Sequence, residues 1–279
     1  MMRIKFTKMH GAGNDFVLID DRDGSFPERG NLIAAMAAGR TGIGCEGVIL
    51  VRNSNKADFK MSFYNPDGTE AELCGNGARC VAAFARRIGA ARSNSMTFET
   101  GAGLVDAEIV ADGLVKIWMP EPRDRRYGLS IGGESGGVPV SGDYLVVGVP
   151  HFIVPVANAA KVDVDMEGRA LRLSEEFAPN GTNVDFVQYI SSSKAIIRTY
   201  ERGVEAESGA CGTGAVAAAV AGVEAHGMSL PMHMRSSQGY DLIVEGDYRQ
   251  SQGTGFTLTG PVRIVFDGEI DLDLLATEA

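Results

Sequence analysis

Apolar residues in this chain often recur at every second position, a pattern typical of half-buried β-strands. Such runs predict strands over 59–64, 113–119, 144–149, 195–200 and 262–266. Apolar residues at helical spacing, without proline, predict helices over 31–40, 76–88 and 213–226. Glycine supplies 36 of the 279 residues, about twice its usual share of roughly 7%, so many turns are expected. The pattern predicts a strand-rich α/β protein.

The two halves of the chain repeat one pattern around two cysteines. Residues 70–78 align without a gap with residues 207–215, and each segment leads into a predicted alanine-rich helix. Upstream, the strand end 63–65 corresponds to 199–201, and residues 13–17 resemble 181–187. Because the period exceeds about 100 residues, the repeat indicates a duplicated domain and not a solenoid.

We therefore expect two similar, pseudo-symmetric domains. The first would comprise residues 1–119, with a C-terminal strand at 264–279 returning to it, and the second would comprise residues 120–263. Prolines, glycines and mixed charge make 120–139 the expected first crossing between them.

Composition excludes several classes of partner. The formal net charge of -10 and the absence of a Lys/Arg run argue against a nucleic-acid partner. No stretch approaches 18 uninterrupted apolar residues, and the N-terminus has no apolar signal core, so we expect no membrane partner and a cytoplasmic protein.

The cysteines at 45, 74, 80 and 211 are too few and too scattered for a disulfide scaffold. Their spacing is also a poor fit to a zinc site, so no metal is expected. We interpret Cys45 and Cys80 as small buried apolar residues, whereas Cys74 and Cys211 occupy the repeated segments.

Both repeated cysteines precede a glycine-rich helix start, Gly75-Asn76-Gly77 in one half and Gly212-Thr213-Gly214 in the other. Free N–H groups and the positive end of the helix dipole favour anions there, namely a thiolate and a bound carboxylate. Inversion of a stereocentre needs one base and one acid on opposite faces of a carbon, and two such thiols supply them. Nothing in the sequence demands pyridoxal phosphate or another cofactor.

Seven motifs in this order resemble the diaminopimelate epimerase family over nearly the whole chain. They are His10-Gly-Ala-Gly-Asn-Asp-Phe16, Tyr64-Asn-Pro-Asp-Gly-Thr-Glu70, Cys74-Gly-Asn-Gly-Ala-Arg-Cys80, Pro150-His151, Gly181-Thr-Asn183, Glu201-Arg-Gly203 and Ala210-Cys-Gly-Thr-Gly-Ala215. The resemblance implies two domains, each a mixed or antiparallel sheet around a central helix. It also implies conversion of LL-diaminopimelate to the meso form in lysine and peptidoglycan precursor synthesis, without metal or cofactor, by a homodimer.

The resemblance implies roles for individual residues. Cys74 and Cys211 would be the acid/base pair, with His151 and Glu201 flanking the reacting centre. Gly75, Asn76, Gly212 and Thr213 would bind the reacting carboxylate, and Asn14, Asn65, Asn183, Glu201 and Arg202 other polar groups of the substrate. Val149 and Gly47 depart from the family pattern, in which many members have asparagine at the first position and some have glutamine at the second.

Other interpretations remain. Residues 42–47 satisfy the dinucleotide fingerprint as a string, but they precede a strand instead of following one. A racemase or epimerase of proline, hydroxyproline or histidine would use the same two thiols. A thiol redox or binding protein would instead join Cys74 and Cys211 in a reversible disulfide.

Overall fold

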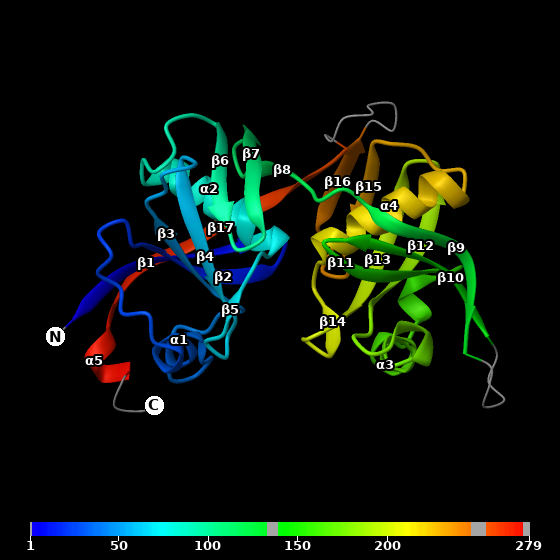
Figure 1. Ribbon diagram of the computed structural model, residues 1–279, viewed down its shortest axis with the longest axis horizontal. Helices are drawn as coiled ribbons and strands as arrows, with labels where there is room; N and C mark the ends of the chain where they lie inside the picture. Colours follow the sequence, from blue (N-terminus) through cyan, green and yellow to red (C-terminus); the bar gives the residue numbers. More distant parts are fainter. Residues whose placement is uncertain (1, 133–138, 247–254, 276–279) are drawn as a thin grey trace. The chain divides into compact units, whose positions relative to one another are not determined.

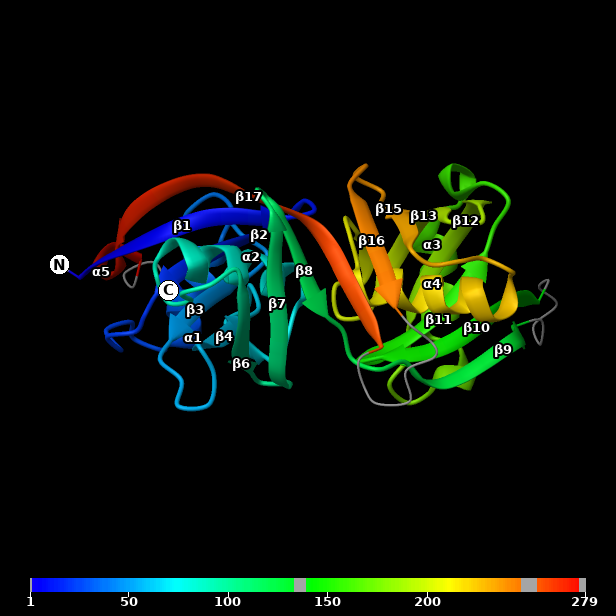
Figure 2. The ribbon, with the colours of Figure 1, turned by 90° about the horizontal axis from the view of Figure 1, so that it is seen from above.

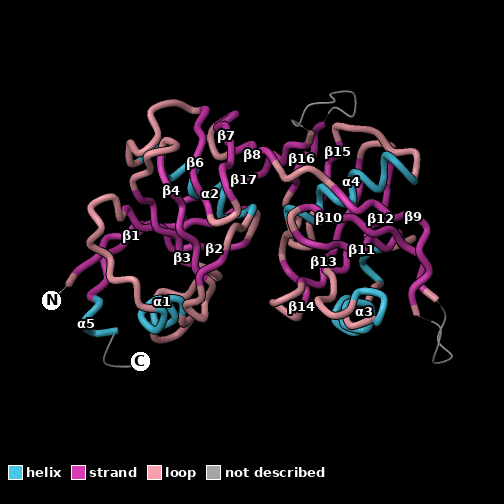
Figure 3. The backbone as a smooth tube through the Cα atoms, viewed as in Figure 1, coloured by secondary structure: helices cyan, strands magenta, loops and turns pink. Residues whose placement is uncertain are grey.

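The computed structural model describes residues 2–132, 139–246 and 255–275 and divides into two compact units. Unit 1 contains residues 1–117 and 260–279, and unit 2 contains residues 118–259. In each unit, β-strands surround one long helix, drawn in cyan among magenta strands in Figure 3. The predicted strand-rich α/β class with two pseudo-symmetric sheets, each around a central helix, is confirmed.

Unit 1 places the helix α2 against the strands β1 to β4 and β7 (Figure 1). Its elements are β1 (Arg3–Gly11), β2 (Asn14–Asp20), α1 (Gly30–Ala37), β3 (Val48–Arg52), β4 (Phe59–Tyr64), β5 (Glu70–Ala71), α2 (Gly75–Arg87), β6 (Ser95–Thr100), β7 (Gly103–Ala111), β8 (Leu114–Trp118) and the C-terminal α5 (Leu272–Leu275).

Unit 2 surrounds the helix α4 with strands in the same way. Its elements are β9 (Arg123–Ile131), β10 (Val140–Val147), β11 (Val149–Pro155), the 3-10 turn η1 (Ala159–Lys161), α3 (Val164–Arg172), a second turn η2 (Glu175–Phe177), β12 (Asn183–Ser191), β13 (Lys194–Glu201), β14 (Ala206–Ser208), α4 (Gly212–Ala225), β15 (Met232–Arg235) and β16 (Asp241–Gly246). The strand β17 (Phe256–Asp271) begins in unit 2 and ends in unit 1.

Strand pairing follows the same order in both units. β1 pairs antiparallel with β2, β2 parallel with β3, β3 antiparallel with β4, and β4 parallel with β6. The strands β10, β11, β12, β13 and β15 repeat this sequence of pairings. β17 pairs with β16 in unit 2 and with β1 in unit 1, and Figure 2 shows it as one continuous strand. The topology supports a duplicated chain.

One part of the predicted repeat is wrong. Residues 13–17 were matched with 181–187, but the first group begins β2 and the second begins β12. In the observed topology β2 corresponds to β11, and β12 corresponds to β3. The short similarity misled because each strand begins near an asparagine and continues with apolar residues, a pattern that several strands share.

The long helices are buried because of their composition. In α4, the residues from Gly212 to Gly222 are alanine, glycine and valine except for Thr213, and an apolar helix surface on every side is stable only in a core. The outer face of the unit 1 sheet is covered by α1 and α5, and that of unit 2 by α3. Each sheet is thus covered by helix on both faces.

The predicted helices agree closely with α1, α2 and α4, and the predicted strand at 59–64 is β4 itself. The predicted strand at 144–149 is interrupted by Gly148, whose φ of 70° separates β10 from β11. The expected crossing at 120–139 contains the strand β9, and residues 133–138 lie outside the described ranges. The helix α3, capped by the Asp163 side chain, was not predicted.

Candidate active site

Cys74 is the N-cap residue of α2, with extended backbone at φ -128° and ψ 122°. It follows the short strand β5, so its side chain stands beside the open N–H groups of the first helical turn. Its thiol is half-buried and donates a hydrogen bond to Asn14 Oδ1, at 3.7 Å from Sγ. Asn14 begins β2, and its Nδ2 donates in turn to Glu46. We name Cys74, Gly75, Asn76 and Asn14 the Cys74 half-site.

A buried guanidinium supports this turn from within unit 1. Arg79 has no exposed surface, and its Nη2 donates to Asn76 Oδ1 at 2.6 Å. Its Nη1 donates to the Gly75 carbonyl at 3.4 Å, whereas its Nε has no hydrogen-bond partner among the described residues. The guanidinium of Arg79 therefore contacts both residues that follow Cys74, Gly75 and Asn76.

Cys211 is the N-cap residue of α4, with a backbone similar to that of Cys74 at φ -105° and ψ 111°. Its Sγ accepts the Gly214 N–H at 3.4 Å and lies 3.5 Å from Thr213 Oγ1. Burial raises the pKa of this thiol well above its ordinary value, and the nearby charges of Glu201 and Asp185 raise it further. The surroundings of Cys211 thus favour the neutral thiol, in contrast to the thiolate that the helix start alone predicts. We name Cys211, Gly212, Thr213 and His151 the Cys211 half-site.

A fully buried polar chain supports the Cys211 half-site. His151 Nε2 lies 2.9 Å from Thr213 Oγ1, and its Nδ1 lies 2.7 Å from Asp185 Oδ2. The other carboxylate oxygen of Asp185 accepts from Thr199 Oγ1 at 2.6 Å. Because the imidazole bonds at both nitrogens, its ring orientation is fixed relative to the first turn of α4.

Asn183 and Arg202 extend the Cys211 half-site. Asn183 Nδ2 lies 3.5 Å from His151 Nε2, and its Oδ1 accepts the Arg202 backbone N–H at 2.7 Å. The Arg202 side chain lines a pocket of about 290 Å³ in unit 2, which Arg126, Pro150 and the loop 180–181 also line. Glu201 acts on the Cys211 thiol through its charge.

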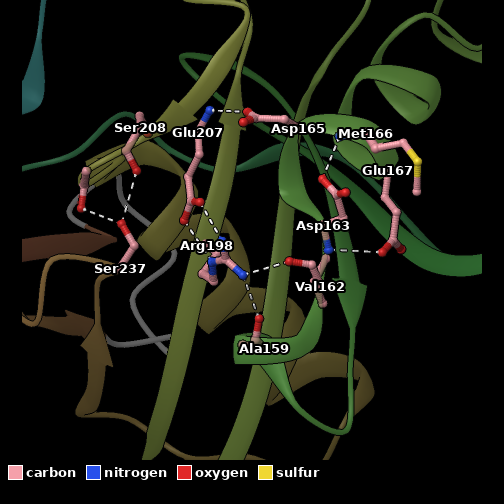
Figure 4. Close-up of polar contacts among 11 residues, drawn as sticks. Ala159, Val162, Asp163, Asp165, Met166, Glu167, Arg198, Glu207, Ser208 and Ser237 are labelled. Carbon is pink, nitrogen blue, oxygen red and sulfur yellow. Dashed lines mark hydrogen bonds and ion pairs between the residues drawn. The ribbon is translucent and has the colours of Figure 1, made fainter.

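The strand that leads to Cys211 is anchored by a polar cluster, shown in Figure 4. Arg198 on β13 forms a bidentate ion pair with Glu207 on β14, and its Nη1 donates to the carbonyls of Ala159 and Val162. The Glu207 N–H donates to Asp165 Oδ1 at 2.9 Å. The cluster fixes the start of the segment that carries Cys211.

Comparison with known proteins gives the family. The family model of diaminopimelate epimerase matches residues 6–123 and 144–257. The chain is 41% identical to a diaminopimelate epimerase of Aquifex aeolicus, over 98% of this chain and 99% of that protein. It is 38% identical to one of Chlorobaculum tepidum, over 95% and 100%.

This chain belongs to the diaminopimelate epimerase family. Solved structures share its fold at lower identity. A phenazine biosynthesis protein of the PhzF family from Bacillus anthracis superposes with a TM-score of 0.75 at 19% identity, covering 97% of this chain and all of that one. A hydroxyproline epimerase from Agrobacterium vitis gives 0.71 at 18% identity, covering 97% and 93%.

The two half-sites of this family member contain most of the residues predicted from the sequence. Cys74, Gly75, Asn76 and Asn14 lie together in unit 1, and Cys211, Gly212, Thr213, His151 and Asn183 lie together in unit 2, with Arg202 beside Asn183. Asn65 follows β4 and donates to Thr69 Oγ1 at 3.1 Å within its own turn. In the described part of the chain, the Asn65 side chain thus bonds within its own turn and is not seen to bond to the Cys74 half-site.

Three residues that support the half-sites were not predicted from the sequence, namely Asp185, Thr199 and Arg79. Asp185 follows Asn183 by two positions, so both side chains lie on one face of β12, and an aspartate inside an apolar strand was the available signal. Thr199 carried no comparable signal. Arg79 lies inside the alanine-rich helix predicted over 76–88, and a buried arginine is rarely found without a partner.

Within the described ranges, no three acidic, histidine or cysteine side chains gather in a way that could hold a metal ion. In the same ranges, no helix has both the length and the apolar composition needed to cross a membrane.

Proposed function

We propose that this protein epimerises LL-2,6-diaminopimelate to meso-diaminopimelate, with Cys74 and Cys211 as acid/base thiols. The observation that carries the proposal is that each unit holds one cysteine as the N-cap of its central helix. One thiolate removes the α-proton, and the other group, as a thiol, delivers a proton to the opposite face. The two thiols exchange roles in the reverse reaction.

The first turns of α2 and α4 supply groups for the reacting carboxylate. Their N–H groups have no partner within the helix, and the helix dipole adds positive potential at these ends. Gly75 and Asn76 in one turn, and Gly212 and Thr213 in the other, would donate to the carboxylate and to the charge that develops in the transition state. Loss of one such donor typically costs about 3 kcal/mol of barrier.

His151 and Glu201 are assigned to orient the reacting amino group. His151 is held by Asp185 and Thr213, and Glu201 acts electrostatically on Cys211. A carboxylate beside a thiol offers an ammonium group an ion-pair partner while keeping the thiol protonated. Both residues therefore enter the proposed catalytic set beside the thiols.

The far end of the substrate is assigned to Asn14, Asn65, Asn183 and Arg202. Arg202 is suited to a distal carboxylate because a guanidinium binds it with two parallel hydrogen bonds. The pocket beside Arg202 is also lined by Arg126 and Glu176, which form an ion pair at 3.6 Å, so Arg202 is the group proposed for the distal carboxylate. This requirement distinguishes diaminopimelate from proline, hydroxyproline and histidine, which lack a second carboxylate.

We further propose that each half, 1–119 with 264–279 and 120–263, contributes one thiol in a cytoplasmic homodimer. A role in lysine and peptidoglycan precursor synthesis follows from the proposed product. The proposal needs no metal or cofactor, since thiols and helix ends supply the proton transfer and the stabilisation of charge.

The test is incubation of the reduced protein with LL-diaminopimelate in deuterium oxide. We expect deuterium at the α-carbon and formation of the meso isomer, followed by mass spectrometry and chiral chromatography. Parallel incubations with proline, hydroxyproline and histidine report the alternative substrates.

Absence of α-deuterium with every substrate would overturn the epimerase proposal. Exchange with proline alone would replace the substrate and keep the thiol mechanism. A protein that exchanges no α-proton but cycles between a Cys74–Cys211 disulfide and two thiols would fit the redox alternative.

A further inference from the structure

Arg79 is a buried cation without a carboxylate partner. No described acidic side chain forms an ion pair with it, and its Nε lacks a hydrogen-bond acceptor. Burial of an unpaired charge is costly, and here burial lowers the pKa of the Arg79 guanidinium. Such a group is retained where an anion can offset its charge.

Two thiols are the groups whose negative charge would stabilise Arg79, namely Cys80 and Cys74. Cys80 is fully buried, and burial raises its pKa far above the ordinary value, so it remains neutral. Cys74 is half-buried at the open end of the helix. Cys74 is therefore the anion that fits Arg79.

We propose that Arg79 is a positioning residue that holds Cys74 as the thiolate in the resting protein, while Cys211 rests as the thiol. The inference rests on the proposed function, since it assigns the starting protonation state of the proposed acid/base pair. Arg79 donates to the Asn76 side chain and to the Gly75 carbonyl, in the two residues that follow Cys74.

Other charges near α2 do not replace this cation. The strands packed against α2 carry these titratable side chains: Arg3, Lys5, Lys8, His10, Asp15, Asp20, Arg52, Lys60, Tyr64, Asp106 and Glu108. The acidic groups among them that lie on β2 are paired, Asp15 with Lys8 and Asp20 with Arg22. None of these groups acts on Arg79 as strongly as the two thiols do.

Unit 2 has an uncharged residue at the matching position. By the alignment of the two helices, the apolar Val216 of α4 takes the place of Arg79. The strands packed against α4 carry Asp143, Tyr144, His151, Asp185, Tyr189, Lys194, Arg198, Tyr200, Glu201, His233, Arg235, Asp241 and Glu245. Of these, Glu201 and Asp185 act on Cys211, and both favour the neutral thiol.

The proposed resting state fixes the first proton transfer. The Cys74 thiolate takes the α-proton from the epimer whose C–H bond faces it, and Cys211 gives its proton to the other face. After that turnover Cys74 is a thiol and Cys211 a thiolate. Transfer of a proton from solvent to Cys211, and loss of one from Cys74, restores the starting state.

The test is the rate of alkylation by iodoacetamide, measured separately for the Cys74 and Cys211 peptides by mass spectrometry between about pH 5 and pH 10. Exposure changes the amplitude of such a profile, whereas the pKa sets its inflection. We expect Cys74 to inflect at lower pH than Cys211. Arg79→Met should raise the Cys74 inflection by about one pH unit or more and leave that of Cys211 unchanged.

Arg79→Lys, which keeps the charge, should preserve the low inflection of Cys74. Arg79→Gln is a second neutral variant in case the methionine variant does not fold, and Val216→Met is the matched control in unit 2, expected to move neither inflection. The proposal is overturned if Cys211 inflects first, or if the neutral variants leave Cys74 unchanged.

These rates require no substrate, so they are independent of the deuterium experiment. Alkylation profiles as expected without α-proton exchange would remove the proposed function and keep the asymmetry. Exchange of the α-proton together with equal inflection pH values for Cys74 and Cys211 would keep the proposed function and remove the asymmetry.

Discussion

The two half-sites have similar backbone conformations but differ in the side chains that pack beneath the helix start. Strand register places Phe16, Ile49 and Phe63 of unit 1 at the positions of His151, Asp185 and Thr199 of unit 2. The first three residues form apolar packing, and the second three form the buried polar chain under Thr213. At the helix, Arg79 of unit 1 has Val216 as its counterpart.

The difference shows which parts of the duplicated pattern the proposed chemistry needs twice. The N-cap cysteine and the glycine-rich turn occur in both units, as two proton-transfer groups require. The buried charged side chains differ between the units: unit 1 has the cation Arg79, and unit 2 has the acidic residue Asp185. A duplicated fold can thus keep two equivalent thiols while giving them different protonation states.

The largest expected effect tests the shared part. Cys74→Ala and Cys211→Ala should each reduce epimerisation by about a thousand-fold or more, because each removes one of the two proton-transfer groups. Chiral chromatography of the product measures the rate, and circular dichroism controls for folding. If one variant retained near-normal turnover, the two-thiol comparison would fail.

The next effect concerns stability beneath the two turns. Asp185→Asn should lower the free energy of unfolding by about 3 kcal/mol, since it disturbs a fully buried carboxylate bonded to His151 and Thr199.

The matched change Ile49→Val removes one methylene group from unit 1 and should cost about 1 kcal/mol. Urea unfolding followed by circular dichroism compares the two variants. Equal losses would show that the polar chain contributes no more to stability than the apolar packing does.

Two glycines sharpen the same comparison with single methyl groups. A Cβ at Gly214 would lie 2.5 Å from Asp185 Oδ1, whereas one at Gly77 would lie 3.1 Å from the flexible Cδ1 of Ile49. Gly214→Ala should therefore cost about 1–3 kcal/mol.

Gly77→Ala should be nearly neutral, because the higher helix propensity of alanine offsets the tight contact by about 1 kcal/mol. Thermal melts of the two variants provide the measurement. A greater loss for Gly77→Ala would contradict the assignment of the polar chain to the underside of α4.

The smallest expected effect is a shift in pH dependence. The Glu201 carboxylate raises the pKa of Cys211, so Glu201→Gln should lower that pKa. Because Cys211 must be protonated to act as the acid, the alkaline limb of kcat/KM should move to lower pH by about one unit or less.

Asn65 occupies the corresponding position in unit 1, after β4, and carries no charge. Asn65→Ala should therefore reduce kcat/KM without moving the alkaline limb. A shift of that limb toward higher pH in Glu201→Gln would contradict the sign of the electrostatic effect.

The sequence predicted the reactive turns well because their determinants are local. A cysteine followed by Gly-x-Gly and an alanine-rich segment specifies an N-cap within a few residues, and α2 and α4 begin at Gly75 and Gly212. The fold class followed from strand periodicity and the repeat.

The supporting residues could not be predicted in the same way. The contact between His151 and Asp185 depends on the register of β11 against β12, and the bond to Thr199 depends on the register of β12 against β13. A shift of one residue in either pairing would turn these side chains to the opposite face. Local sequence does not fix such a register.

The strand β17 sets an order on the assembly of the molecule. Residues 262–271 complete the pairing of β1, yet they follow all of unit 2 along the chain. During synthesis, β1 can pair with β2 at once, but it lacks its second neighbour until the ribosome has passed the whole of unit 2. Formation of that last strand pair closes a loop of more than about 200 residues, which makes it a slow, long-range step. Unit 2 has all of its internal partners earlier and can form first.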